Sequence, residues 1–474
     1  MMTTDFEAVI GLEVHAELKT ATKIFCSCPT TFGAAPNTLC CPVCLGLPGA
    51  LPTLNRRAVE LAVRAGLALD CKIATLCRTD RKQYFYPDLP KAYQISQDPY
   101  PLCFDGGLDV GEGEHALRIG IARIHIEEDA GKLIHTGDKT LVDCNRCGVP
   151  LIEIVTRPVL RSPEEAGAFL RALRQILVTC EVSDCRMQEG SLRCDVNVSL
   201  RKKGSEELGT RTEIKNINSF AFVEKAIAYE IQRQTELLQS GSVLRAETRR
   251  FDASTGKTEL MRIKESADDY RYLAEPDLPA LALTQEEIDA IAKTLPELPR
   301  ARAERLTRDC GIAKADAEIF VTDPALGDYF EQAASATTHK TLLSGLILTD
   351  LLRHCQSDPF ASPVKARRMG EIAEMMGEGR VNSSTAKKLV ARLIEGDFDP
   401  REAVLAEGLA QIRDRETLVR IVDEVLTESS KAVADYKNGK LAALRALQGR
   451  AMAKTKGLAD PVLLETILLE KLSN

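Results

Sequence analysis

The chain has 474 residues, 44% of them hydrophobic and 28% charged, with a formal net charge of −7. This length predicts two to four domains with ample core, and the composition is typical of soluble globular proteins. No apolar stretch approaches the roughly 20 residues that span a bilayer, and the first seven residues resemble neither a secretory signal nor a transit peptide. We therefore expect a cytoplasmic protein without membrane contact. The negative net charge argues against a general nucleic-acid coat.

The first predicted strand covers residues 8–18, where polar and apolar side chains alternate. Glu13, His15 and Glu17 occupy alternate positions, and the residues between them are apolar. Because strand side chains point to opposite faces in turn, one face is Glu/His/Glu and the other packs on a core. Such a face suits a hard cation. The alternative is an ordinary half-exposed strand.

Thirteen of the 15 cysteines lie before residue 195. Their odd number and their distribution are unlike a secreted disulfide scaffold and favour reduced thiols. Two knuckles stand out, Cys26-Ser-Cys28 and Cys41-Pro-Val-Cys44. Their spacing predicts four thiolates on one structural Zn²⁺, with metal-free cysteines as the alternative. Cys144 and Cys147 form a further C-x2-C pair. This pair has no partner knuckle nearby, and we interpret it as ordinary reduced cysteines.

The first 290 residues predict an α+β domain whose sheet is mostly antiparallel, since no strand–helix–strand rhythm repeats. Ser162 is the expected N-cap of one helix. Further strands are expected at 117–128, 151–156, 192–200 and 210–216, and helices at 55–68, 163–180 and 219–238. From Thr284 the pattern is helical, at 284–294, 299–310, 313–321, 324–336 and 340–354, with short helices after Pro363. We predict three domains, at 1–290, 291–400 and 401–474.

Carboxylates recur on the predicted strands. Glu153 lies inside an apolar run, where an unpaired charge would cost several kcal/mol, so a cation or donor should lie close by. Further polar and charged residues on the predicted strands are His125, Glu127, Glu128, Asp195, Asn197, Arg211, Glu213 and Lys215. Each strand alone is more simply a salt-bridged strand. Together they predict a concave sheet that holds Mg²⁺ and a polyphosphate. A P-loop ending at Gly256-Lys257-Thr258 is excluded, because Phe251 replaces its first glycine.

The C-terminal part contains a basic run in an otherwise acidic chain. Residues 431–456 carry seven Lys or Arg residues against one acid, Asp435, which gives 7 − 1 = +6. An RNA backbone contact is one interpretation, and a solvated helix face is the other. We predict Lys437, Lys440 and Arg445 as RNA-contacting residues.

Several long, ordered segments resemble the B-subunit family of tRNA-dependent Asp/Glu amidotransferases, and the resemblance extends over essentially the whole chain. The segments are IGLEVHAEL (10–18), CPVCLGLPGALP (41–52), YPDLPKAYQISQ (86–97), EEDAGK (127–132), GSLRCD (190–195), GTRTEIKN (209–216) and DYRY (269–272). This chain departs from the usual family residue at Cys144, Cys147, Gln188 and Val196, none of which is a matched metal position.

The resemblance implies a glutamine-synthetase-like cradle sheet, a helical domain and a small helical tail domain that contacts tRNA. It implies a carbon–nitrogen ligase that uses glutamine as the amido donor. ATP would phosphorylate the side-chain carboxyl of Asp or Glu mischarged on tRNA-Asn or tRNA-Gln, and ammonia would displace the phosphate. The ammonia would come from an amidase-type A subunit, joined through a small C subunit in a heterotrimer.

Carried over by position, the Mg²⁺ ligands implied by the family are Glu13, His15, Glu128, Glu153 and Glu213. The implied zinc ligands are Cys26, Cys28, Cys41 and Cys44. Arg211 and Lys215 would stabilise charge that develops during phosphoryl transfer. Lys91, Asp195 and Asn197 are predicted nucleotide-binding residues.

Three other functions compete with this one. A zinc-containing tRNA-binding module without catalysis would leave the acidic strands merely structural. A self-contained ligase related to glutamine synthetase would use free ammonia and a free amino acid, but the basic run disfavours it. The third alternative is the archaeal E-subunit relative. It is disfavoured, because the family resemblance implies that this relative is a longer chain with an inserted domain.

Overall fold

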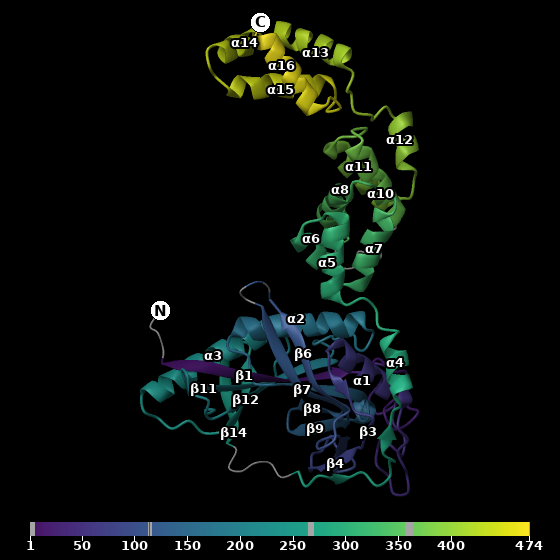
Figure 1. Cartoon of the computed structure of the whole chain (residues 1–474), viewed down its shortest axis with the longest axis vertical. Coiled ribbons are helices and arrows are strands. Elements are labelled where there is room, and N and C mark those ends of the chain that lie inside the picture. Colours follow the sequence, from purple (N-terminus) through teal and green to yellow (C-terminus); the bar gives the residue numbers. More distant parts are fainter. Residues whose placement is uncertain (1–4, 112, 114–115, 264–269, 356–363, 474) are drawn as a thin grey trace. The chain divides into compact units, whose positions relative to one another are not determined.

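The computed structural model describes residues 5–111, 113, 116–263, 270–355 and 364–473. Internal contacts divide the chain into two units, Met1–Leu298 and Pro299–Asn474. Figure 1 shows the first as strands with helices and the second as helices alone. Asp269, the first residue of the 269–272 segment, lies outside the described residues. The division into domains at 1–290, 291–400 and 401–474 remains a prediction.

A nine-stranded sheet organises the first unit, and its strands pair antiparallel except for β12 and β13, which run parallel. This confirms the α+β class. In spatial order the strands are β14 (Lys257–Ile263), β13 (Glu247–Asp252), β12 (Thr212–Lys215), β11 (Leu192–Lys202), β1 (Phe6–Glu17), β10 (Pro150–Thr156), β7 (Leu117–Glu128), β6 (Cys103–Val110) and β2 (Lys72–Ile73).

Helices cover one face of this sheet and bury its apolar side chains. Figure 1 shows α2 (Pro163–Thr179) and α3 (Phe220–Gln239) along the sheet, and α1 (Arg56–Ala68) packs against β6 and β7. Leu12, Val14 and Ala16 of β1 are almost fully buried in this core. The predicted N-cap is confirmed, because the Ser162 hydroxyl accepts the backbone N–H of Glu165 at 3.2 Å.

Smaller sheets and a hairpin flank the main sheet, and sequence patterning gave no sign of them. They comprise β3 (Leu76–Cys77) with β16 (Leu281–Ala282), β4 (Asp80–Gln83) with β5 (Tyr93–Ser96) and β15 (Leu273–Ala274), and the hairpin β8 (Lys132–Thr136) to β9 (Lys139–Asp143). Helix α4 (Gln285–Ala292) starts with a capping box formed by Thr284 and Glu287, and its Ile288 joins the core of the first unit.

The second unit contains two separate hydrophobic cores, one within residues 303–404 and one within 418–472. Its helices are α5 (Pro299–Cys310), α6 (Lys314–Phe320), α7 (Pro324–Ala334), α8 (Lys340–Gly345), the π-helix η3 (Leu346–Leu351), α9 (Leu352–His354), α10 (Ala366–Gly377), α11 (Ser383–Glu395), α12 (Pro400–Ala406), α13 (Arg415–Glu428), α14 (Ser430–Lys437), α15 (Ala442–Lys454) and α16 (Pro461–Ser473). In the core within residues 303–404, the rings of Phe320 and Phe330 stack with centroids 4.3 Å apart.

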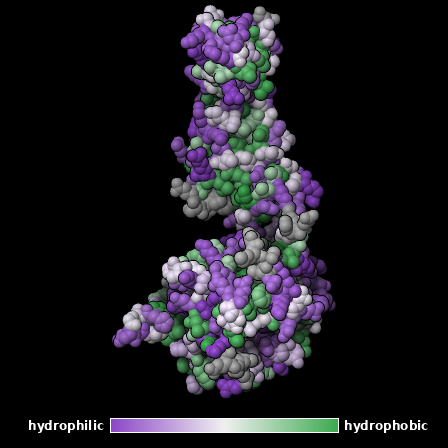
Figure 2. All heavy atoms as spheres, turned by 90° about the vertical axis from the view of Figure 1, so that its left-hand side faces the viewer, coloured by the Kyte–Doolittle hydropathy of each residue, from purple (hydrophilic) through white to green (hydrophobic). Residues whose placement is uncertain are grey.

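Hydrophilic residues cover much of both units on the face drawn in Figure 2, with hydrophobic residues interspersed among them. Among the helices of the described residues, none combines the length and the apolar character that a membrane crossing requires.

Candidate functional site

The face of the main sheet opposite the helices carries the polar side chains that the alternation of β1 predicted. Strand register places them in rows across neighbouring strands. Residue His15 of β1 stands opposite Glu153 of β10 and Arg193 of β11, and Glu153 in turn stands opposite His125 of β7. A neighbouring row contains Asp195 and Glu13.

The first cluster on this face consists of His15, Glu127 and Glu153, whose ligating atoms lie within 4.8 Å of one another. The His15 Nε2 atom is 3.6 Å from Oε2 of Glu153 and 3.7 Å from Oε1 of Glu127. A fourth group borders the cluster, since His125 Nε2 lies 3.1 Å from Oε2 of Glu153. Ser96 donates its hydroxyl proton to Glu127 Oε2 at 3.1 Å, which orients that carboxylate.

Electrostatics lower the pKa of both carboxylates of the first cluster. Burial alone raises the pKa of Glu153, but the charge of His125 and its hydrogen bond outweigh burial and hold that pKa well below its usual range. For His125, burial disfavours the charged form and lowers the pKa. The charge of Glu153 outweighs this effect of burial and raises the pKa of His125 to about 9. Two imidazoles thus lie where their protonated forms would balance two buried carboxylates. Neutral imidazole nitrogen and carboxylate oxygen are suitable ligands for a divalent cation, so binding through His15 requires that its Nε2 atom carry no proton.

The second cluster consists of Glu13, Asp195 and Glu213, whose ligating oxygens also lie within 4.8 Å of one another. The Lys215 ammonium lies 2.5 Å from Asp195 Oδ2 and 3.0 Å from Glu213 Oε1. Asn197 donates an amide hydrogen to Glu13 Oε1 at 2.9 Å. Three carboxylates and one ammonium give a formal charge of −3 + 1 = −2, which one Mg²⁺ would neutralise. Its all-oxygen donor set fits a hard cation.

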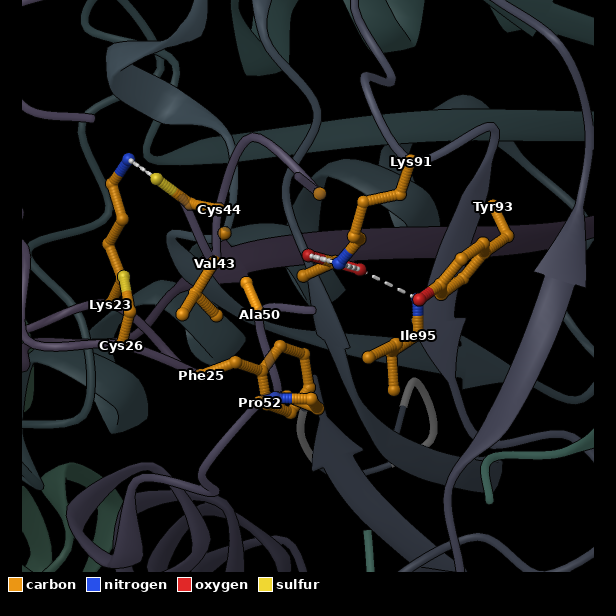
Figure 3. Close-up of a pocket in the computed structure, with 13 residues that line it drawn as sticks. Lys23, Phe25, Cys26, Val43, Cys44, Ala50, Pro52, Lys91, Tyr93 and Ile95 are labelled. Carbon is orange, nitrogen blue, oxygen red and sulfur yellow. Dashed lines mark hydrogen bonds and ion pairs between the residues drawn. The ribbon is translucent and has the colours of Figure 1, made fainter. Parts of the chain in front are cut away.

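Glu128 belongs to neither cluster, although the family resemblance implied it as a metal ligand. Its carboxylate pairs with Lys91, with Nζ 2.6 Å from Oε2, and accepts the Ile95 backbone N–H at 2.8 Å. Glu128 lines a pocket of about 90 Å³. Figure 3 labels Lys91, Ile95 and Cys44 among the other residues that line this pocket. The structure instead brings Glu127 to the cluster, so Glu127 is a candidate ligand that the residue assignment missed.

The sequence contained a signal for this difference. The buried isoleucines of β7 occupy odd positions at Ile119 and Ile121 but even positions at Ile124 and Ile126. A register shift opposite Val155 and Thr156 accounts for the change, as a β-bulge does. Residues 123, 125 and 127 therefore face the cluster side, and residue 128 does not.

Arg211 is not one of the residues that form the two clusters, but it lies near Glu13 of the second cluster. It is exposed and lines a hollow of about 220 Å³ together with Glu13, Asn197 and Gly209. Arg123 is a cation on the polar face that sequence reasoning did not single out, and its Nε atom is buried. Among the described residues, no hydrogen-bond partner is found for that atom.

The four predicted zinc ligands converge, with Cys26, Cys28, Cys41 and Cys44 placing their sulfur atoms within 4.8 Å of one another. The Cys41 and Cys44 sulfurs lie 3.9 Å apart, close to the roughly 3.8 Å that tetrahedral Zn–S bonds of about 2.3 Å require. Lys23, fully buried, donates to Cys44 Sγ at 3.6 Å, as Figure 3 shows. Hydrogen bonding from Cys26 and from the Cys41 backbone, with the Lys23 charge, lowers the pKa of Cys44 to about 4. The four thiols fit a structural metal.

The predicted RNA-contacting residues lie around the turn between α14 and α15. Lys437, Lys440 and Arg445 are exposed, and Gly439 forms the turn with a positive φ of 87°. Lys440 pairs with Asp435 at 2.8 Å. Within the part of the chain that the structure describes, Lys437 and Arg445 form no intramolecular ion pair.

A mostly antiparallel sheet with two carboxylate clusters on one face, a four-cysteine site and separate helical cores define an α+β protein with a candidate cation-binding face. Residues 8–289 match the family model described as the GatB/GatE catalytic domain, and residues 328–472 match the GatB domain. The chain therefore belongs to the amidotransferase B-subunit family.

Relatives match this chain from end to end. Two of them carry the name of the B subunit of aspartyl/glutamyl-tRNA(Asn/Gln) amidotransferase. They are the proteins of Caldicellulosiruptor bescii, 48% identical over 477 residues, and Caldanaerobacter subterraneus subsp. tengcongensis, 49% identical over 472 residues. In both comparisons, the aligned region covers 99% of each chain. A third with the same name, from Clostridium botulinum, is 46% identical over 471 residues, with 98% of this chain and 99% of the relative covered.

Proposed function

We propose that this chain is the amidotransferase subunit in which the side-chain carboxyl of Asp or Glu, mischarged on tRNA-Asn or tRNA-Gln, is activated by ATP and amidated. The observation that carries this proposal is the pair of clusters on one sheet face, first His15, Glu127 and Glu153, and second the carboxylates around Lys215. Membership of the B-subunit family supports it.

The proposed reaction has two steps. A side-chain carboxylate oxygen attacks the γ-phosphorus of ATP, the bond to the β,γ-bridging oxygen breaks, and an acyl phosphate and ADP form. Ammonia then attacks the carbonyl carbon and loses one proton, while the C–O bond breaks and inorganic phosphate leaves. The product is Asn-tRNA or Gln-tRNA. The class is a carbon–nitrogen ligase with glutamine as the amido donor.

The chain's own residues would bind and orient the reactants. The first step brings two anions together, so cations must offset their repulsion. Lys215, already paired with Asp195 and Glu213, is placed to offset negative charge beside the second cluster. Mg²⁺ held by either cluster would neutralise phosphate charge. Lys91, Asp195 and Asn197 remain proposed nucleotide contacts, and Arg211 a proposed cation for developing charge.

The remaining parts of the proposal concern partners and the other metal. An amidase-type A subunit would release ammonia from glutamine, and a small C subunit would join the two in a heterotrimer. Structural Zn²⁺ would be bound by Cys26, Cys28, Cys41 and Cys44. The basic residues Lys437, Lys440 and Arg445 would contact tRNA, because they are exposed on the small helical core.

The decisive experiment mixes the purified three-subunit complex with ATP, Mg²⁺ and each mischarged tRNA. We expect phosphate release that depends on both Mg²⁺ and mischarged tRNA, and amidated product when glutamine or ammonia is present. If tRNA binds but ATP is not hydrolysed under any of these conditions, the chain is a non-catalytic zinc-containing tRNA-binding module. If free Asp or Glu replaces charged tRNA, the proposed substrate class is wrong.

A further inference from the structure

Thr248 of β13 forms a buried hydrogen bond with a carboxylate of the second cluster. It stands directly opposite Glu213 in the parallel pair of β12 and β13. Its hydroxyl donates to Glu213 Oε2 at 3.0 Å, and the residue is only 2% exposed. A hydrogen bond to an ionised acceptor is roughly twice as strong as one between neutral groups. Thr248 therefore constrains the direction in which Glu213 points.

Each carboxylate of the second cluster has a donor from the chain itself. Asn197 donates to Glu13 Oε1 at 2.9 Å, Lys215 to Asp195 Oδ2 at 2.5 Å, and Thr248 to Glu213 Oε2. The other oxygen of Glu213, Oε1, lies on the side shared with Asp195, because Lys215 contacts both. Thr248 thus holds the oxygen that points away from the centre of the cluster.

The opposite face of β13 fixes the position of Thr248. The next residue, Arg249, points to the helix side, where its Nε atom lies 3.2 Å from Oε1 of Glu230 on α3. Glu230 is fully buried and also accepts the hydroxyl hydrogen of Thr258. Because a buried ion pair anchors β13 from behind, the Thr248 hydroxyl is held at a fixed distance from Glu213.

We propose that Thr248 is a positioning residue of the second cluster, which orients Glu213 so that Oε1 remains directed at a bound divalent cation. This inference rests on the proposed function, in which the second cluster binds Mg²⁺. Groups that orient a metal ligand from behind typically contribute 10–100-fold to metal affinity. Removing the hydroxyl should therefore weaken cation binding at this cluster by about 10-fold or more.

The test measures binding of Mn²⁺ alone to the full-length chain by electron paramagnetic resonance. The Mn²⁺ bound at the second cluster is identified as the class of bound Mn²⁺ that the Glu13→Gln substitution removes. Thr248→Val keeps the β-branched shape but removes the donor, and should weaken that class about 10-fold. Thr248→Ser keeps the hydroxyl and should restore binding close to wild type. The Mn²⁺ class lost on His15→Ala should be unchanged in both Thr248 variants.

The matched control is Thr258→Val, which removes a buried hydroxyl from the same hairpin on the helix side. It should lower the melting temperature without changing Mn²⁺ affinity. Wild-type Mn²⁺ affinity in Thr248→Val, or an equal loss in Thr258→Val, would overturn the positioning role alone. If Glu13→Gln removes no Mn²⁺ from the wild-type chain, the magnesium assignment of the second cluster fails, and the role of Thr248 fails with it.

Discussion

His15 of β1 and Glu153 of β10 stand opposite each other in the sheet, with Nε2 of the histidine 3.6 Å from Oε2 of the glutamate. This cross-strand pair belongs to a face that shares no residue with the hydrophobic core, because Leu12, Val14 and Ala16 point the other way. Substitutions on the polar face can therefore change the chemistry while leaving the packing intact.

Replacing a ligand of either cluster should abolish activation. We expect His15→Ala and Glu13→Gln to lower tRNA-dependent phosphate release by about 10²-fold or more, equivalent to about 2.7 kcal/mol of barrier. The assay uses the three-subunit complex at saturating Mg²⁺, with circular dichroism to confirm folding. Glu7→Gln is the matched control, since Glu7 lies on the same strand but pairs with Arg201 at 2.8 Å. A folded His15→Ala variant with wild-type rate would refute the assignment.

Neighbouring residues Glu127 and Glu128 should behave differently. Glu127→Gln should remove one class of bound Mn²⁺, because Glu127 belongs to the first cluster. Glu128→Gln should keep that class but destabilise the chain by about 3 kcal/mol, since it leaves the Lys91 ammonium, whose side chain is only 11% exposed, without its partner. Manganese titration and chemical denaturation of both variants check this. If Glu128→Gln loses this class of Mn²⁺ and Glu127→Gln retains it, the metal ligand is Glu128, as the family resemblance implies.

The contrast between these two glutamates illustrates what the sequence could predict. On β1, uninterrupted alternation correctly placed Glu13 and His15 on one face, because the side-chain period of a strand is two. On β7 the bulge shifts that period, so residue types alone could not decide between Glu127 and Glu128. The change from odd to even isoleucines was the only local sign.

Strands β13 and β14 were missed for a different reason. Their segments are rich in charge, with Arg249, Arg250 and Glu259 where a half-buried strand usually has apolar residues. The structure explains the tolerance, because Glu230 of α3 pairs with Arg249 in the interior. The hydrogen bond from Thr248 to Glu213 joins residues 35 positions apart on different strands. Such a contact leaves no periodic trace, so the donor Thr248 could not be found from sequence either.

The cysteine site should hold structural zinc. Cys26→Ser or Cys41→Ser should release metal and lower the melting temperature, with loss of activity following loss of fold, because zinc binding contributes directly to folding. Elemental analysis after preparation without chelators checks the stoichiometry. Fewer than about 0.2 zinc ions per chain would count against the four-thiolate site. Cys310→Ser, on a helix of the second unit, is the control and should retain full zinc.

The basic turn between α14 and α15 should bind the tRNA body and take no part in the chemistry. Contacts to phosphates release counterions, so binding should weaken steeply as salt increases. Changing Lys437, Lys440 and Arg445 together to Glu should raise KM for mischarged tRNA and flatten the salt dependence. Turnover with ammonia at saturating tRNA should change little, because neither carboxylate cluster is altered.

Titration of the complex with mischarged tRNA at two salt concentrations tests this role. The matched control applies the same charge change to Arg300, Arg308 and Lys314, three exposed residues of α5 and α6. Because net charge falls equally in both triple variants, a loss of affinity confined to the first identifies a local contact. If the first variant keeps wild-type affinity and salt slope, its basic residues form only a solvated helix surface, and tRNA binds elsewhere on the chain.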